Sequence, residues 1–304
     1  MTSVLLTGAS GFIGRQAITP LLEHGYTVHA ISTQPRLADT RVQWHIGNLL
    51  DPTCAPDLLS EIRPSHLLHF AWYAEPARYW TSSLNVDWVR ASLNLLDAFA
   101  SHGGQRVLMA GTCAEYDWTT SYSAVTEDTT PFIPTMPYGQ CKHALQLALN
   151  AFATSRHLSA AWGRIFFLFG PYEAPTRLVP SVINALLKRE PVLCSHGEQL
   201  RDFLHVADVA ESFVALLNSK VTGAVNMGSG QAVALRDVIN MLAAELAEPA
   251  LVGFGARPAP VGEPARLVAN VRRLTDEVRW RPRYTLAAGL QQTIAWWKQH
   301  ETYH

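Results

Sequence analysis

The N-terminal stretch Val4-Leu5-Leu6-Thr7-Gly8-Ala9-Ser10-Gly11-Phe12-Ile13-Gly14 decides the fold of this chain. Its first three residues predict a buried strand, and a helix that Gly25 ends is predicted from the apolar spacing of Ala17, Ile18, Leu21 and Leu22. Between them, glycines spaced G-x-x-G-x-x-G allow a tight turn that brings the backbone close to a pyrophosphate at the helix N-terminus. The flanking strand and helix are the context that such a turn requires. We therefore predict a dinucleotide-binding turn formed by Gly8, Ser10, Gly11, Phe12, Ile13 and Gly14.

The second predicted strand, residues 27–31, ends at a position that distinguishes two dinucleotides. An acidic residue here would bind the ribose hydroxyls of NAD, whereas its absence together with a nearby arginine suits the 2′-phosphate of NADP. This chain has Ser32 at that position and Arg36 shortly after it, which favours NADP(H), with NAD(H) possible. Arg36 could equally be a solvated loop charge. A third strand, 42–46, leads to Asn48 and Leu49, which we place near the adenine end of the cofactor.

Two further strands end in residues of functional interest. The apolar run 66–70 continues into Phe70, Ala71 and Trp72, where a small residue lets the chain pass close to a cofactor. The strand 106–110 is followed by Thr112, at the sheet edge where ligands bind in open α/β sheets. Thr112 can donate a hydrogen bond to a substrate carbonyl oxygen, or it can simply cap a turn.

The stretch Tyr138-Gly139-Gln140-Cys141-Lys142 carries a candidate acid/base pair. Residues four apart share one face of a helix, so the tyrosine and lysine side chains are neighbours. An ammonium there can lower the pKa of the phenol from its usual ~10 and let it exchange a proton near neutral pH. The alternative is a chance pair on an amphipathic helix.

Alternating strands and helices predict an α/β fold, a Rossmann-type doubly wound parallel sheet with a smaller, mixed C-terminal lobe. We assign residues 1–170 to the dinucleotide-binding domain, with 201–228 returning to it. Residues 171–200 and 229–304 form the substrate-binding lobe, and the cleft between the two parts is the expected substrate site.

Composition excludes several classes of protein. The 304 residues are 48% hydrophobic and 16% charged with a net charge of −1, and no basic run favours nucleic acid or a membrane surface. No apolar run approaches the ~18 residues of a membrane-spanning helix, and the N-terminus lacks a signal-peptide pattern. The four cysteines have no metal-ligand spacing, so we expect no metal, reduced thiols and a cytoplasmic protein.

Taken together, the motifs resemble the extended short-chain dehydrogenase/reductase family of nucleotide-sugar epimerases, dehydratases and ketoreductases. Besides the glycine turn and the Tyr138 motif, Thr112 stands four residues before Tyr116, and F-G-P follows at 169–171. R-D-F-L-H-V-A-D-V-A at 201–210 and N-M-G-S-G at 226–230 complete the series. These pieces span almost the whole chain in the family's order.

The resemblance implies roles for individual residues. Tyr138 would be the acid/base, Lys142 would lower its pKa and hold the nicotinamide ribose, and Thr112 would position the substrate oxygen beside Cys113. Arg201 would bind the diphosphate of a nucleotide-diphosphate sugar, with Arg266 or Arg257 completing the clamp. The alternative for Arg201 is an ion pair with Asp202. The family also implies a homodimer formed through the helix that bears the Tyr-Lys pair.

Departures from the family pattern narrow the reaction. Sugar 4,6-dehydratases have Asp-Glu directly after the threonine, where this chain has Cys113 and Ala114, so elimination chemistry is not expected. The serine at position 32 argues against an epimerase that holds NAD tightly. The sequence therefore favours NADPH-dependent reduction of a 4-keto deoxy sugar nucleotide. The alternatives are an NAD-dependent nucleotide-sugar epimerase without net redox change and a non-catalytic dinucleotide-binding scaffold.

Overall fold

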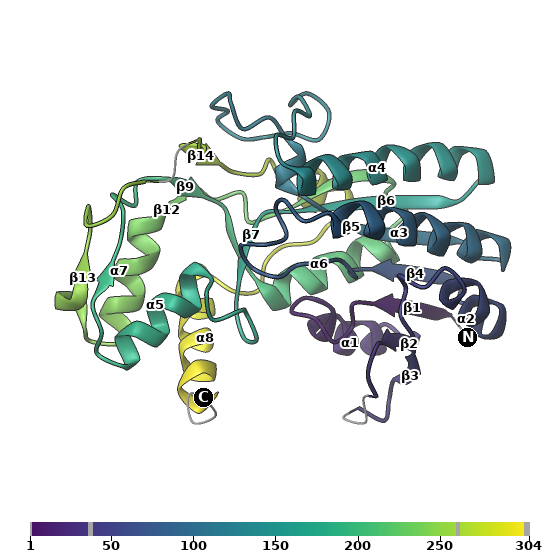
Figure 1. The fold of residues 1–304 in the computed structure, drawn as a ribbon, viewed down its shortest axis with the longest axis horizontal. Helices are drawn as coiled ribbons and strands as arrows, with labels where there is room; N and C mark the ends of the chain where they lie inside the picture. The colour runs from purple at the N-terminus through teal and green to yellow at the C-terminus, as the bar shows by residue number, and fades with distance from the viewer. Residues whose placement is uncertain (1, 36–38, 260–261, 301–304) are drawn as a thin grey trace.

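A seven-stranded parallel sheet is the centre of the computed structural model, which describes residues 2–35, 39–259 and 262–300. Its strands lie in the order β11-β6-β5-β4-β1-β2-β3 (Figure 1). Their bounds are β1 Ser3–Thr7, β2 Thr27–Ser32, β3 Gln43–Ile46, β4 His66–His69, β5 Arg106–Thr112, β6 Ser159–Ile165 and β11 Gly223–Met227. The strand order reverses between β1 and β4, and in this class of sheet ligands bind at such a reversal. The predicted α/β, doubly wound fold is confirmed.

Helices cover both faces of the sheet. One face carries α2 (Cys54–Ile62), α3 (Leu84–Ser101) and α4 (Pro137–Arg156), and the other carries α1 (Gly14–Glu23) and α6 (Val206–Asn218). Successive strand residues point to opposite faces, so Leu5 packs in the α2–α4 layer while Leu6 packs in the α1–α6 layer. Burial on both faces explains why these strands are continuous apolar runs.

The last strand of the sheet comes from far along the chain. β11 pairs in parallel with β6 and covers its free edge. Beside it, the buried guanidinium of Arg106 donates to the carbonyl oxygens of Leu216, Leu217 and Val221, at the C-terminal end of α6. A cation at a helix C-terminus satisfies carbonyls that lack helical partners. The contact fixes α6 and β11 against β5.

A second lobe is built from α5 (Leu178–Leu187), α7 (Leu235–Glu245) and α8 (Leu286–His300) around a separate apolar core. Figure 1 shows it beside the sheet domain, at the carboxyl ends of the strands. Small sheets complete it: β8 (Val192–Leu193) with β13 (Val252–Gly253), and β9 (Leu200–Arg201) between β12 (Val233–Ala234) and β14 (Arg266–Leu267). The short helical turns are η1 (Cys113–Glu115), η2 (Pro249–Leu251) and η3 (Arg273–Glu277).

The largely apolar run 162–169 has the pattern of a single strand, but it breaks after Ile165. The N–H of Phe166 donates to the Met227 carbonyl, whereas that of Phe167 donates to the Asp202 carbonyl. β7 (Phe167–Phe169) therefore leaves the main sheet and pairs with β10 (Phe203–His205). These two strands lead from the sheet domain into the second lobe.

In the described ranges, no helix combines the length and apolar character needed to cross a bilayer. None of the four cysteines, all within the described residues, forms a disulfide in this structure.

Candidate active site

The glycine turn lies between β1 and α1, and two of its glycines are packed against the protein itself. Gly8 has φ +68°, and a Cβ on it would lie 2.7 Å from the Ala71 nitrogen. A Cβ on Gly14 would lie 2.2 Å from the Gly8 oxygen. At Gly11 the only neighbour within 4 Å, in the part of the chain that the structure describes, is the Gly8 oxygen at 3.1 Å. Gly8 and Gly14 thus shape the turn, and Gly11 leaves its surface open.

The N-terminus of α1 is available to an anion. Its N-cap, Ile13, provides no side-chain oxygen, and the N–H groups of Arg15 and Gln16 bond only to the Gly11 and Ile13 carbonyls of the turn itself. Arg15 braces the turn from behind, with Nη2 2.6 Å from the Ser10 oxygen and Nε 3.1 Å from the Gly11 oxygen. This arrangement fits a dinucleotide pyrophosphate, as predicted from Ser10, Phe12 and their glycine neighbours. The brace by Arg15 was not anticipated, because one arginine after a glycine turn carries no local signal.

The residues chosen for the adenosine end are engaged in local turns. The Ser32 hydroxyl accepts from the Gln34 N–H at 3.3 Å, and the exposed Asn48 side chain accepts from the Leu50 N–H at 3.1 Å. Leu49, which was also predicted to lie near the adenine end, is buried. Arg36, on which the NADP preference depended, lies outside the described residues. Arg41, the next arginine, is bound by both carboxylate oxygens of Asp39.

The chain after β4 passes directly over the glycine turn. The N–H of Phe70 donates to the Thr7 carbonyl, and that of Ala71 donates to the Thr7 hydroxyl at 3.2 Å. Trp72 donates from Nε1 to the Asn85 side chain at 2.9 Å. The predicted Phe70–Trp72 segment therefore borders the turn, at the strand reversal.

Thr112 and Tyr138 meet at the carboxyl end of β5. Thr112 ends the strand and caps η1, and its side chain is close enough to that of Tyr138 to lower the pKa of the phenol. Tyr138 stands in the first turn of α4, with its ring edge-on to Tyr79 at 4.8 Å and to Trp80 at 5.6 Å between centroids. The structure thus brings together two of the three predicted catalytic groups, under an aromatic wall that local sequence patterns did not reveal.

Lys142, the third group, lies one turn further along α4 and points beneath the tyrosine. Its Nζ donates to the Ala110 carbonyl oxygen at 2.8 Å and lies 3.7 Å from the centre of the Trp72 ring. Burial lowers the pKa of Lys142 to about 7, against an opposing influence of the Glu115 carboxylate. The lysine therefore touches the Phe70–Trp72 segment, on the cofactor side of the site.

The expectation that the pKa of Tyr138 is lowered is wrong. Burial raises this pKa above the usual value of 10, Tyr79 raises it further, and the Thr112 side chain opposes the shift. Lys142 is not among the causes, because its ammonium is directed to Ala110 and Trp72. Tyr138 is therefore a protonated phenol at neutral pH.

Arg201 is buried, and its partner is neither of the two expected ones, a substrate diphosphate or Asp202. Nη2 pairs with Glu263 at 2.9 Å, and Nη1 donates to the Pro264 carbonyl at 2.8 Å. The alternative pair with Asp202 is not formed, since both Asp202 oxygens accept from backbone N–H groups of Ser229, Gly230 and Ala269. A diphosphate could reach this guanidinium only by taking the place of Glu263.

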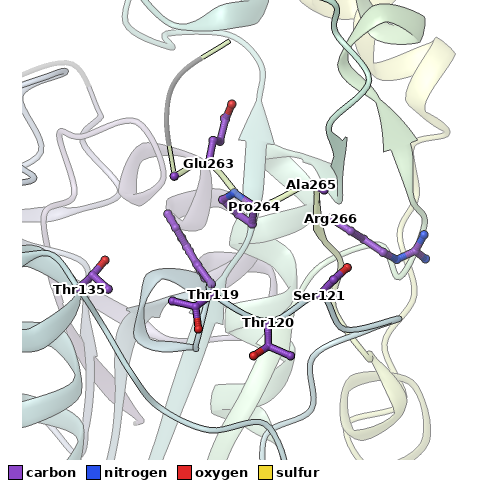
Figure 2. A pocket seen from close by; sticks show the side chains of 10 residues that line it. Thr119, Thr120, Ser121, Thr135, Glu263, Pro264, Ala265 and Arg266 are labelled. Atoms are coloured by element: carbon purple, nitrogen blue, oxygen red, sulfur yellow. The ribbon is translucent and has the colours of Figure 1, made fainter.

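A cavity of about 380 Å³ adjoins this ion pair. Residues Trp118, Thr119, Thr120, Ser121 and Thr135 line one side, and the segment 262–266 lines the other (Figure 2). Arg266 lies at its border and donates from Nε to the Ser123 carbonyl at 2.6 Å. Trp118 also contacts Trp80, with 5.9 Å between ring centroids, and so links the lining of the cavity to the aromatic side chains that pack on Tyr138.

Two other residues lie at the site, of which the sequence analysis named only the first. Cys113 is buried, and burial raises the pKa of its thiol to about 12, which keeps the thiol protonated. Arg177, which the sequence did not single out, is exposed at the N-cap of α5, 5.3 Å from the centre of the Tyr79 ring. Only the tertiary contact with Tyr79 reveals that this cation lies near Tyr138.

Fold and site together define a dinucleotide-dependent α/β enzyme scaffold, and the chain belongs to the NAD dependent epimerase/dehydratase family, whose sequence profile matches residues 4–228. It is 29% identical over 314 residues to a UDP-glucose 4-epimerase of Corynebacterium glutamicum, with 93% of this chain and 91% of that protein covered. The predicted resemblance to the extended short-chain dehydrogenase/reductase family is thereby confirmed.

Solved structures agree with this assignment. The Thermus thermophilus UDP-glucose 4-epimerase in complex with NAD superposes with a TM-score of 0.85 at 25% identity, covering 98% of this chain and 99% of that one. MoeE5 in complex with UDP-glucuronic acid and NAD gives 0.84 at 27% identity, covering 99% and 100%. Neither the expected NADP preference nor the ketoreductase interpretation receives support from these relatives.

Proposed function

We propose that this protein is an NAD-dependent epimerase that inverts the hydroxyl-bearing C4 of a nucleotide-linked sugar. The observation that carries the proposal is the contact between Thr112 and Tyr138 at the carboxyl end of β5, beside the glycine turn. Relatives named UDP-glucose 4-epimerases and solved with NAD support the epimerase over the reductase that the sequence favoured.

The chain offers a coherent set of groups for the cofactor. The open surface at Gly11 and the uncapped N-terminus of α1 suit a pyrophosphate, and the segment 70–72 with Lys142 borders the nicotinamide half. When bound there, NAD supplies a reversible hydride acceptor. Nothing else in the reaction requires an external oxidant or reductant, because the hydride that leaves the sugar carbon returns to it.

Tyr138 moves the proton that accompanies the hydride. In the oxidative half it takes the proton of the C4 hydroxyl as a phenolate, and in the reductive half it returns that proton to the alkoxide oxygen. Thr112 donates a hydrogen bond to the same oxygen and stabilises the charge that develops on it. Because burial raises the pKa of Tyr138, the resting phenol is prepared for the reductive half, and ionisation must precede the oxidative half.

The substrate's diphosphate would be held by two guanidinium groups. Arg177 is exposed beside Tyr79 at the N-terminus of α5, where the helix dipole also favours an anion. Arg201 lies behind Glu263 and becomes available when that carboxylate is displaced. Tyr79 and Trp80 cover Tyr138 and would exclude water from the reacting carbon.

The test is to incubate the purified protein with UDP-glucose and NAD⁺ and to follow the formation of its C4 epimer, UDP-galactose, by NMR. We expect interconversion without net accumulation of NADH, and Tyr138→Phe should lower the rate by about 100-fold or more while NAD still binds. Steady consumption of NADPH with a 4-keto sugar nucleotide would instead establish a reductase. If Tyr138→Phe reacts at the wild-type rate, the assigned chemistry is wrong.

A further inference from the structure

A fully buried carboxylate lies directly beneath the catalytic turn. Both Glu115 oxygens are used: Oε1 accepts from the Thr112 N–H at 2.9 Å and from Trp162 Nε1 at 2.9 Å, and Oε2 accepts from Arg164 Nε at 2.8 Å. Glu115 and Thr112 form a reciprocal capping box across η1. The Thr112 side chain bonds to the backbone at the Glu115 end of the turn, and the Glu115 side chain bonds to the backbone of Thr112. The position of Thr112 therefore depends on this carboxylate.

Arg164 connects the same carboxylate to other side chains of the sheet domain. Its guanidinium donates from Nη1 to the Tyr116 hydroxyl and from Nη2 to Gln146 Oε1, both at 3.3 Å, and it lies 4.3 Å from the Phe132 ring centre. An ion pair removed from water is costly and contributes little net stability compared with apolar packing. Stability alone therefore does not account for charges at this place.

The turn is closely packed around the carboxylate. A Cβ on Gly111 would lie 2.6 Å from Glu115 Oε1, and a Cβ on Gly139 would lie 2.3 Å from the Ala114 carbonyl oxygen. Gly139 belongs to the buried stripe of α4 that also contains Lys142 and Gln146. Gly139 touches the turn and Gln146 binds Arg164, so Lys142 lies on the same stripe between them, and the charge of the Glu115 carboxylate acts on it.

We propose that Glu115 is the positioning residue of this site: it fixes Thr112 through the backbone and supplies the buried negative charge opposite Lys142, without contacting the substrate. The inference rests on the proposed roles of Thr112 and Lys142. A valine or other apolar residue at position 115 would fill the space but provide neither function.

Other titratable groups near Lys142 do not supply this charge. Burial holds the pKa of His69 at about 3, so it is neutral, and Arg164 is a cation. Other titratable groups of the described residues that influence the turn or α4 include Tyr79, Cys113, Tyr116, Glu127, Tyr138, His143, Arg201 and Asp202. Of the carboxylates among them, Glu127 is directed to the Asn226 N–H at 2.8 Å and Asp202 to the 229–230 loop.

The charge of Lys142 can be measured without substrate, because the chain has only four lysines: Lys142, Lys188, Lys220 and Lys298. In protein labelled with ¹³Cε-lysine, the NMR signal missing from Lys142→Met identifies this residue. Its titration midpoint should lie near pH 7 in the wild type and move to lower pH in Glu115→Gln, which keeps an acceptor for Thr112 but removes the charge. The other three lysines should not change.

Glu127→Gln is the matched control, since it removes a second carboxylate of the same buried region that is bonded to Asn226. It should leave the Lys142 midpoint in place. If Glu115→Gln does not fold by circular dichroism, Glu115→Gln combined with Arg164→Met is compared with Arg164→Met alone, and the difference between their two Lys142 midpoints should show the same shift. An unchanged Lys142 midpoint in the folded variant, or an equal shift in Glu127→Gln, would overturn the proposal.

Activity gives the second readout. In Glu115→Gln the alkaline limb of the kcat profile should move to lower pH with KM nearly unchanged, and Glu115→Asp should partly restore it. A loss of folding alone would lower activity equally at every pH. If the wild type shows no epimerase activity at all, the proposed function fails while the lysine titration still decides the role of Glu115.

Discussion

The ammonium of Lys142 lies 3.7 Å above the centre of the Trp72 ring, in a position that directs it to the cofactor side of the site rather than to Tyr138. The indole face and the Ala110 carbonyl together stabilise a charge that burial opposes. The lysine therefore stays near the midpoint of its titration at neutral pH, where small changes in its surroundings alter its charge.

Removing the indole should make Lys142 easier to deprotonate. We expect Trp72→Leu to lower its titration midpoint by about one pH unit, since a desolvated cation–π contact contributes ~2 kcal/mol or less. Trp72→Phe keeps an aromatic face and should give an intermediate value. The measurement is the lysine NMR titration without cofactor, and equal midpoints in Trp72→Leu and the wild type would show that the indole does not stabilise the charge.

The Thr112 hydroxyl should matter for turnover and not for cofactor binding. Thr112→Val has the same shape but lacks the donor, and we expect kcat to fall by about 100-fold with NAD affinity preserved. Thr112→Ser keeps the hydroxyl and serves as the control, with activity near that of the wild type. Steady-state kinetics and calorimetric NAD titrations separate the two effects; similar rates for the valine and serine variants would contradict the role.

Glu173 should make stability depend on pH in a defined direction. It is buried, its Oε2 has no hydrogen-bond partner among the described residues, and burial raises its pKa from 4.5 to about 8 against the influence of Arg177. Below pH 4.5 the carboxyl is neutral in both states, so it costs nothing. As pH rises toward 8 the unfolded chain ionises first, and folding stability is lost.

Glu173→Gln should therefore stabilise the protein increasingly from about pH 5 to pH 8, by a few kcal/mol at the plateau. Urea denaturation at pH 5, 7 and 9 measures this gain. Glu190→Gln, at an exposed glutamate, is the control. A gain of the same size at pH 5 and pH 9 would mean that ionisation of Glu173 is not its cause.

We propose that NAD(H) binds more tightly than NADP(H). The two relatives of known structure described above contain NAD. Among the described residues, Arg41 is the first arginine after β2 in the sequence, and its charge is paired with that of Asp39. Fluorescence titration of the protein with NADH and NADPH should give the lower Kd for NADH. A clear preference for NADPH would restore the importance of Arg36 and favour the reductase again.

We also propose that the chain forms a homodimer through α3 and α4, which lie side by side on the sheet. Each helix exposes a large apolar side chain, Val86 at 47% and Leu147 at 55%. Leu147→Asp should convert dimers to monomers in analytical ultracentrifugation. Leu193→Asp, at a leucine that is 47% exposed in the second lobe, should not. A monomeric wild type would exclude this arrangement.

The sequence predicted those features that depend on local pattern. The glycine turn and Thr112 were found because each lies at a strand end, and Tyr138 was found because of its spacing from Lys142. Contacts between distant segments could not be predicted in this way. Glu115 and Arg164 are 49 positions apart and look like ordinary surface charges until β5 and β6 are paired.

Electrostatic effects were the least predictable. The spacing of Tyr138 and Lys142 indicated proximity, but the pKa of each depends on burial and on Glu115, Tyr79 and Trp72, which no spacing reveals. The break after Ile165 was missed for a similar reason. An apolar run has the same pattern whether it stays in one sheet or passes to a second one.

The late arrival of β11 has a consequence for how the chain is made. A ribosome that has released residues 1–170 has produced a sheet whose β6 edge is unpaired and whose Arg106 has none of its three carbonyl partners from the region 216–221. Until Met227 emerges, the nascent domain presents an open strand edge, the kind of surface to which chaperones and other chains attach. Residues 1–170 alone therefore lack one strand of the sheet and these partners of Arg106, and the sheet is completed only when the later segment is synthesised.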